Sequence, residues 1–185
     1  LDLCTGNGAI PLLLAHRTKG DITGLEIQSR LVNMANRSVQ LNNLQTQIHI
    51  LGGDLKERHP DLKQSFYDVV TCNPPDFKTP KKTELNQNEF LTIARHEVYC
   101  TLEDVIKACK LYVKPGGKVA MVHRPERLVD LITLFRTYHI EPKRLQYVYP
   151  KANKEANTIL IEGVRDGKTG LNILPPLFIY KEDGT

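Results

Sequence analysis

The sequence is 185 residues long, with 41% hydrophobic and 25% charged residues and a formal net charge of +4. This length suits one domain, for which roughly 100–200 residues are typical, so we expect a single domain over residues 1–185. No apolar run approaches the roughly 18 residues of a membrane span and no low-complexity segment or repeat occurs, which argues against the membrane, disordered and solenoid classes.

The chain opens at Leu1 inside a predicted strand, without an initiator Met, a signal peptide or a leading helix. We therefore expect that an N-terminal part is missing. The cysteines are far apart and form no C-x-x-C pair, which is typical of reduced thiols in the cytoplasm rather than of a zinc site or a disulfide framework. They are Cys4, Cys72, Cys100 and Cys109.

Runs of apolar and β-branched residues alternate with helical segments along the chain. Two helices carry start signals, because Thr101 and Asp104 have the spacing of a capping box and Pro125 suits a first helical position. The predicted strands are residues 1–4, 21–27, 47–52, 67–72, 118–123, 145–149 and 158–162, and the predicted helices are residues 11–17, 29–42, 101–113 and 125–138.

This alternation predicts an α/β fold: a doubly wound, Rossmann-like, seven-stranded sheet that is mostly parallel and has helices on both faces. The residues Lys-Pro-Gly-Gly at 114–117 should end one helix and turn into the next strand. Only about eight residues join the last two strands, too few for a parallel crossover. We therefore expect an antiparallel C-terminal strand.

The first predicted strand leads into a turn with two glycines, followed by a helix. Gly6 and Gly8 allow a ligand to approach the backbone, and a helix N-terminus favours a negatively charged group such as a carboxylate. Glu26 ends the next strand, where an acidic side chain can accept hydrogen bonds from ribose hydroxyls. The alternatives are a tight turn that binds nothing and a surface glutamate at a strand end.

Polar residues also follow the third and fourth predicted strands. Asp54 can accept a hydrogen bond from an adenine amino group, or it can be the N-cap of a following helix. Asn73, Pro74 and Pro75 would place an amide oxygen, and carbonyls without competing N–H groups, at the carboxyl edge of the sheet. Such acceptors can hold a planar amino group and direct its lone pair towards an incoming methyl group. A simple turn is the alternative.

The order of glycine turn, Glu26, Asp54 and Asn-Pro-Pro resembles the class I S-adenosylmethionine-dependent methyltransferases. More narrowly, three further motifs resemble the bacterial family that methylates N6 of adenine 37 in a valine tRNA. These motifs are Ala-Arg-His-Glu-Val at 94–98, His-Arg-Pro-Glu-Arg at 123–127 and Glu-Ala-Asn-Thr at 155–158, and they complement Asp-Leu-Cys-Thr-Gly-Asn-Gly at 2–8.

The resemblance covers nearly the whole chain. It implies S-adenosyl-L-methionine as the cofactor, tRNA as the substrate and a cytoplasmic, metal-independent N-methyltransferase that binds RNA. The residues that it implies as cofactor ligands are Asp2, Gly6, Gly8, Glu26, Asp54 and Asn73, and Asn73, Pro74 and Pro75 are implied as the clamp on the amino group.

The sequence departs from the family pattern directly after this clamp. The family has an aromatic residue, usually Tyr, that stacks on the target base, whereas this chain has Asp76 and then Phe77. A base stack is worth roughly 1–3 kcal/mol, and an aspartate offers no stacking face. Either Phe77 takes over the stacking and belongs to the catalytic residues, or Asp76 marks a changed substrate or an impaired enzyme.

Basic residues are concentrated in the stretch 124–154, which carries seven basic and three acidic side chains. Such a stretch can contact phosphates, or it can be an ordinary solvated surface. Arg124 and Arg127 follow the fifth predicted strand and are the leading RNA contacts. Arg95 and His96, in the long polar segment 76–100, are further candidates, although an ion pair with the adjacent Glu97 would also explain them.

Two other functions remain open at this point. An Asn-Pro-Pro clamp also occurs in enzymes that methylate guanine N2 in ribosomal RNA or the glutamine side chain of release factors, although the motifs at 94–98 and 123–127 argue against both. A module that binds cofactor or RNA without turnover is the second alternative, and Asp76 is the feature that favours it.

Overall fold

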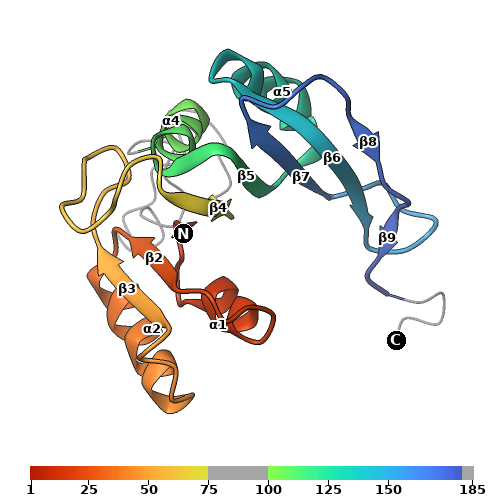
Figure 1. Ribbon diagram of the computed structural model, residues 1–185. Helices are drawn as coiled ribbons and strands as arrows, with labels where there is room; N and C mark the ends of the chain where they lie inside the picture. Colours follow the sequence, from red (N-terminus) through yellow and green to blue (C-terminus); the bar gives the residue numbers. More distant parts are fainter. Residues whose placement is uncertain (75–99, 181–185) are drawn as a thin grey trace, which may run out of the picture.

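The computed structural model describes residues 1–74 and 100–180 (Figure 1). Helices and strands alternate along most of this part of the chain. The elements are β1 (Asp2–Leu3), α1 (Ala9–Ala15), β2 (Ile22–Glu26), α2 (Ser29–Leu41), β3 (Ile48–Gly52), β4 (Tyr67–Cys72), α4 (Leu102–Tyr112), β5 (Val113–His123), the 3-10 helix η1 (Pro125–Arg127), α5 (Leu128–Thr137), β6 (Ile140–Tyr149), β7 (Thr158–Arg165), β8 (Asn172–Ile173) and β9 (Leu177–Phe178).

The strands form one sheet in the order β3-β2-β1-β4-β5-β7-β6-β8, with β9 also paired to β6. The strands from β3 to β5 run parallel, whereas β7 is antiparallel to both β5 and β6. This confirms the predicted doubly wound, mostly parallel sheet with an antiparallel C-terminal strand. The predicted number of seven strands is wrong, because the described part of the chain contributes nine strands to the sheet.

The two additional strands, β8 and β9, are each only two residues long, too short to produce a periodic pattern. Both pair parallel to β6 at one edge of the sheet. Pro175 and Pro176 lie between them, and since proline has no N–H to donate, they interrupt what would otherwise be one edge strand.

Two strands begin earlier than predicted. Residues 114–117, expected to form a turn before the strand, lie inside β5, where the register with β4 shifts and Gly116 has a φ of 73°. In β6 the register with β7 shifts between Pro142 and Arg144. Glycine and proline are accommodated in strands at such irregularities, so these residues do not end the strands.

The helices agree closely with the sequence pattern. α1 begins at Ala9, two residues before the predicted start, and holds Pro11 in its first turn, where a missing N–H needs no partner. The capping box of Thr101 and Asp104 is present at the start of α4. Pro125 does begin a helical segment, but its first turn is the 3-10 helix η1.

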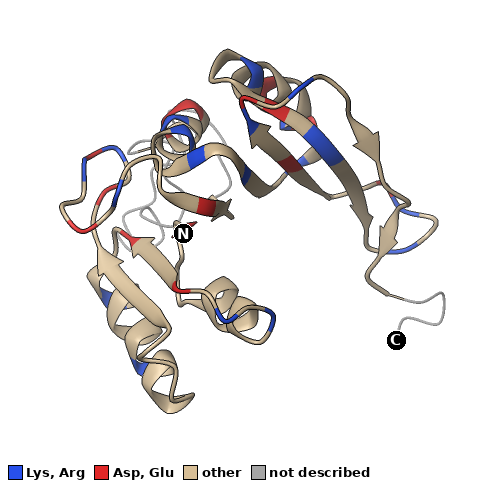
Figure 2. Cartoon of the chain, viewed as in Figure 1, with Lys and Arg blue, Asp and Glu red and all other residues tan. Residues whose placement is uncertain are grey.

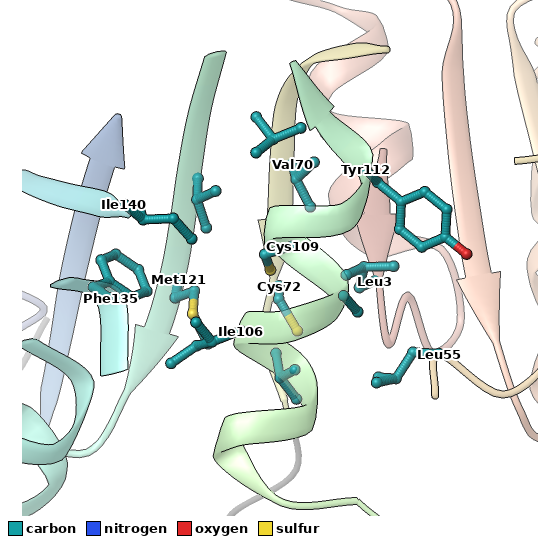
Figure 3. Packing of buried hydrophobic residues seen from close by; sticks show 14 of the residues in the cluster. Leu3, Leu55, Val70, Cys72, Ile106, Cys109, Tyr112, Met121, Phe135 and Ile140 are labelled. Carbon is teal, nitrogen blue, oxygen red and sulfur yellow. The ribbon is translucent and has the colours of Figure 1, made fainter. Parts of the chain in front are cut away.

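Two clusters of buried side chains lie on opposite faces of the sheet. The larger one packs α4 and α5 on the sheet, with Leu3, Val70, Ile106 and Phe135 among its members (Figure 3). The smaller one joins α1 and α2 to β2 and β3. The larger cluster includes buried residues of β1 and β4, so its packing holds in place the strands that lead to the candidate site.

The cysteines of the described residues are all free thiols. Cys72 and Cys109 are buried, and burial raises the pKa of both thiols; burial also raises the pKa of Cys100 to about 12. Thiols with raised pKa carry little thiolate and are therefore unreactive. This agrees with the prediction of reduced cysteines.

Among the helices in residues 1–74 and 100–180, none has the length and apolar character needed to cross a membrane. The same residues contain no group of three or more His, Cys, Asp or Glu side chains arranged to hold a metal ion. The single-domain expectation concerns the whole chain and stays a prediction.

Candidate functional site

Gly6, Asp54 and Asn73 come after β1, β3 and β4, and Glu26 ends β2. These four parallel strands are neighbours in the sheet, and β2, β3 and β4 can be followed in Figure 1. Leu3, the last residue of β1, pairs with Leu25 of β2 on one side and with Cys72 of β4 on the other. The glycine turn, Glu26 and Asn73 therefore leave the sheet side by side. In open α/β sheets, the carboxyl ends of the parallel strands are where ligands bind.

The glycine turn is held against the sheet by backbone hydrogen bonds. Thr5 N donates to Leu25 O at 3.0 Å, and Gly8 N donates to Thr5 O at 3.0 Å. Gly6 and Gly8 have φ of 59° and 83°. A Cβ at Gly8 would approach Ala35 Cβ to 3.1 Å, whereas a Cβ at Gly6 would have nothing within 4 Å. The turn therefore leaves open space beside Gly6.

Glu26 is fixed in direction by two backbone donors. Its Oε2 accepts from Gly6 N and its Oε1 accepts from Gln28 N, both at 2.9 Å. The residue is only 5% exposed, so the alternative of a surface glutamate is wrong. A carboxylate held in this way keeps further lone pairs available as acceptors, which is what binding of ribose hydroxyls requires.

Asp54 lies close to this point because Gly53 N donates to Glu26 O at 3.0 Å. Its Oδ1 accepts from Lys56 N at 2.9 Å, and its Oδ2 is 3.6 Å from Lys56 Nζ. The side chain therefore stabilises a turn, and the described residues that directly follow it form no α-helix that it could cap. Its contact with an adenine amino group stays a prediction.

Asn73 is exposed at the end of β4, next to the start of the glycine turn, and Pro74 is buried. An exposed amide directly after a strand can meet an incoming planar group. Four other predicted site residues, Pro75, Phe77, Arg95 and His96, lie outside the described residues, as does Asp76.

Asp2 occupies a different position from the other predicted cofactor ligands. It is completely buried, and its carboxylate accepts hydrogen bonds from Thr5 Oγ1 and Thr71 Oγ1, each at 2.6 Å. Burial raises the pKa of Asp2, while the hydrogen bonds from the two threonines lower it. Direct contact with a cofactor stays a prediction; the contacts that the structure gives Asp2 are with the threonines.

Thr5 and Thr71 are the residues of this site that the sequence did not indicate. Thr5 lies within the motif at 2–8, whose pattern points to the glycines, and Thr71 lies in none of the motifs. The one usable signal is the strand order: once β1 lies beside β4, Asp2 pairs with Thr71 and both side chains lie on the same face of the sheet.

The basic residues of the stretch 124–154 are distributed over several elements, with acidic residues near them (Figure 2). Three of these seven cations form ion pairs within the chain. Three pairs are Arg127–Asp130, Arg136–Glu141 and Arg144–Glu162, with N–O separations of 2.8, 3.4 and 3.7 Å.

Arg124 is better placed than these for a substrate contact. It follows β5, the strand next to β4, and its Nη1 donates to Asn157 O at 3.4 Å. Asn157 ends the loop between β6 and β7, which also carries Lys151 and Lys154. Arg124 and this loop therefore lie together near the strand ends that carry Asn73.

A cavity of about 280 Å³ lies against β4, β5, β6 and β7, with Ile10 of α1 in its lining. Thr71 also contributes to its wall, but none of the predicted cofactor ligands does. The cavity therefore gives no support to their assignment, which depends on the strand-end geometry.

Comparison with known proteins assigns the family. Residues 1–148 match the methyltransferase small domain. The chain belongs to this family. A curated relative from Porphyromonas gingivalis is 30% identical to the chain over 165 residues, and one from Aeromonas salmonicida is 26% identical over 163 residues. Both relatives carry the name tRNA1(Val) (adenine(37)-N6)-methyltransferase.

These alignments cover 88% and 87% of this chain, but the chain spans only 64% and 66% of the two relatives. Among solved structures, a predicted O-methyltransferase from Agrobacterium tumefaciens has a TM-score of 0.76 and 20% identity, covering 98% of this chain and 80% of that one. A geranyl diphosphate C-methyltransferase from Streptomyces coelicolor has a TM-score of 0.65 and 9% identity, covering 89% of this chain and 69% of that one. At these identities the structures establish the fold alone.

Proposed function

We propose that this protein transfers a methyl group from S-adenosyl-L-methionine to the N6 amino group of an adenine in tRNA. The observation that carries the proposal is the exposed Asn73 amide beside the glycine turn and Glu26, in a chain whose curated relatives are named for this reaction. Methyl transfer to tRNA would take place in the cytoplasm, where free thiols persist.

The strand ends offer features that fit the donor. The turn leaves open space beside Gly6, so a ligand can approach the backbone there without meeting a side chain. Glu26 presents a buried, oriented carboxylate towards which ribose hydroxyls can donate. Asp54 is the candidate partner of the adenine ring of the donor. When bound, S-adenosyl-L-methionine would supply an electrophilic methyl group.

The acceptor side depends on Asn73. The lone pair of an adenine N6 amino group is conjugated with the ring, which makes the nitrogen a poor nucleophile. By accepting a hydrogen bond from N6–H, the Asn73 side-chain oxygen would localise this lone pair on the nitrogen. Pro74 has no N–H and so cannot compete as a donor at that point. Nitrogen would gain the methyl group as the methyl–sulfur bond of the donor breaks and leaves S-adenosylhomocysteine, and it would release a proton to solvent, so the chain needs no strongly basic side chain.

Two further residues of the clamp, Pro75 and Phe77, are proposed from the sequence alone. Pro75 would continue the run of acceptors without N–H groups, and Phe77 would stack on the flipped adenine in place of the aromatic residue that Asp76 replaces. For the RNA, Arg124 and the loop between β6 and β7 supply positive charge near Asn73, and Arg95, His96 and Arg127 are further candidate contacts.

The proposal is tested by tritiated-methyl incorporation into total tRNA from a strain that lacks the gene, followed by nucleoside analysis. We expect label in N6-methyladenosine with the wild-type protein. Asn73→Ala should abolish incorporation and leave the dissociation constant for S-adenosylmethionine within about threefold, because the interaction that it removes is made with the nucleophile in the transition state.

Other outcomes identify the alternatives. Label in guanine of ribosomal RNA or in a release factor would replace the adenine assignment with another planar amino group. Cofactor binding without transfer to any of these acceptors would indicate a non-catalytic binding module. Full turnover by Asn73→Ala would show that the clamp is assigned to the wrong residue.

A further inference from the structure

A row of paired residues crosses the sheet just below the candidate site. Asp2 of β1 pairs with Gly24 of β2 and with Thr71 of β4. Paired residues on neighbouring strands project on the same face, so Asp2 and Thr71 face each other directly. Thr71 lies in β4, two residues before Asn73, and its hydroxyl donates to Asp2 Oδ1 at 2.6 Å.

At the other end of the row, Gly24 leaves space for the side chain of Thr5. A Cβ at Gly24 would come within 2.9 Å of both Thr5 Cγ2 and Thr5 Oγ1. The missing side chain at Gly24 therefore leaves room for Thr5 to fold back over the sheet, where its hydroxyl donates to Asp2 Oδ2 at 2.6 Å. Thr5 immediately precedes Gly6, so this contact anchors the glycine turn.

The carboxylate of Asp2 thus joins two parts of the site that are far apart in sequence. Oδ2 accepts from Thr5, which precedes the glycine turn where the donor would bind. Oδ1 accepts from Thr71, near the end of the strand that leads to Asn73, where the acceptor would bind. Both are short hydrogen bonds to a completely buried carboxylate, and hydrogen bonds to a charged group in a low-dielectric environment are stronger and more directional than neutral ones.

We propose that Asp2 is a positioning residue that sets the distance between the donor turn and Asn73 through Thr5 and Thr71. Methyl transfer requires the nucleophile to lie in line with the methyl group at close range, and small displacements of one partner reduce the rate strongly. In this role Asp2 acts through the two threonines, which is distinct from the direct cofactor contact that the resemblance implies. This inference rests on the proposed function for the part that concerns Asn73.

We call the two hydrogen bonds of Asp2, from Thr5 and from Thr71, the brace. Each of the two hydrogen bonds is tested separately with a variant of similar shape. Thr71→Val removes only the hydroxyl that holds β4, so we expect kcat to fall by at least about tenfold while the dissociation constant for S-adenosylhomocysteine stays within about twofold. Thr5→Val removes the hydroxyl that holds the turn, so the same dissociation constant should rise by at least about tenfold. The two variants thus affect different measurements.

Thr71→Ser is the matched control, because it keeps the hydroxyl and loses only a methyl group. It should retain kcat within about threefold of wild type. A purely structural role would lower the midpoint of urea unfolding in Thr5→Val and Thr71→Val but leave binding and kcat unchanged, and this result would overturn the proposal. Equal kcat in Thr71→Val and Thr71→Ser would overturn it as well.

The proposed function can fail independently of the brace. If wild-type protein binds S-adenosylhomocysteine but transfers no methyl group to tRNA, then the acceptor is wrong, and Thr5→Val still decides by binding alone. An unchanged dissociation constant in Thr5→Val would then overturn the brace, and the expected weakening would support it.

Discussion

At the scale of single residues, a substitution at Gly6 should affect ligand binding more than it affects folding. Its φ of 59° and the open space around it mean that alanine meets no atom and costs only the left-handed backbone strain, about 1–2 kcal/mol. The new methyl group would project into the space assigned to the donor. We expect Gly6→Ala to weaken S-adenosylmethionine binding in calorimetry by at least about tenfold, or about 1.4 kcal/mol.

Gly116 provides the matched control for this prediction. It also has a positive φ, 73°, and a Cβ there would meet nothing within 4 Å, but it lies in the irregular start of β5. Gly116→Ala should lose a similar free energy of unfolding and bind the donor like wild type. Equal donor affinities in the two variants would mean that the donor does not approach the glycine turn.

The placement of Gly6, Gly8 and Glu26 at the same strand ends could be predicted, because glycine and acidic residues after strands have a recognisable spacing, whereas their contacts with a donor stay a prediction. Gly6, Gly8 and Glu26 are placed together as expected. The Asp2 contacts could not be predicted, because Thr71 is distant in sequence and becomes a neighbour only through the strand order. Hydroxyl groups in a buried strand give no periodic signal that distinguishes a positioning contact from ordinary packing.

At the scale of elements, α5 packs against the sheet at a position where β7 has no side chain. A Cβ at Gly163 would lie 2.6 Å from Ile140 Cγ2 and 2.9 Å from Phe135 Cδ2, both buried. Overpacking of a filled core costs typically about 1–3 kcal/mol. We expect Gly163→Ala to lower the free energy of unfolding in urea by this amount.

Gly52 of β3 is the matched strand glycine, since a Cβ there would make only an ordinary contact, 3.8 Å from Val32 Cγ2. Gly52→Ala should leave the free energy of unfolding unchanged or raise it slightly, because alanine restricts the unfolded chain. Similar losses in Gly52→Ala and Gly163→Ala would contradict the packing argument.

The starts of β5 and β6 show where the prediction of elements from sequence fails, and why. Their buried central residues have a clear apolar pattern, whereas their first residues include Pro115, Gly116 and Pro142, which are typical of turns. Sheet partners accommodate these residues through register shifts. β8 and β9 depend even more on their partner, because two residues have no intrinsic preference for a strand.

At the scale of the whole molecule, the net charge of +4 says little about where RNA would bind, since several cations are paired internally. What matters is which cations lie at the carboxyl edge of the sheet. Arg124 follows β5 at this edge, beside the loop between β6 and β7, whereas Arg136 is on α5 and pairs with Glu141. The two arginines carry the same charge in different places.

This difference leads to a prediction about the salt dependence of tRNA binding. Removing one contact between a cationic side chain and a phosphate reduces the slope of log K against log salt by about 0.7–0.9. Arg124→Ala should therefore weaken binding at low salt and reduce the slope by this amount, and Arg127→Ala should do so only as far as its pairing with Asp130 leaves it available to phosphate. Arg136→Ala, which removes the same charge far from the strand ends, should leave the slope unchanged.

Filter binding over a range of salt concentrations measures the slope for all three variants. Equal slopes for wild type, Arg124→Ala and Arg136→Ala would remove Arg124 from the RNA interface, whereas equal reductions in both variants would indicate that binding senses total charge rather than a defined surface.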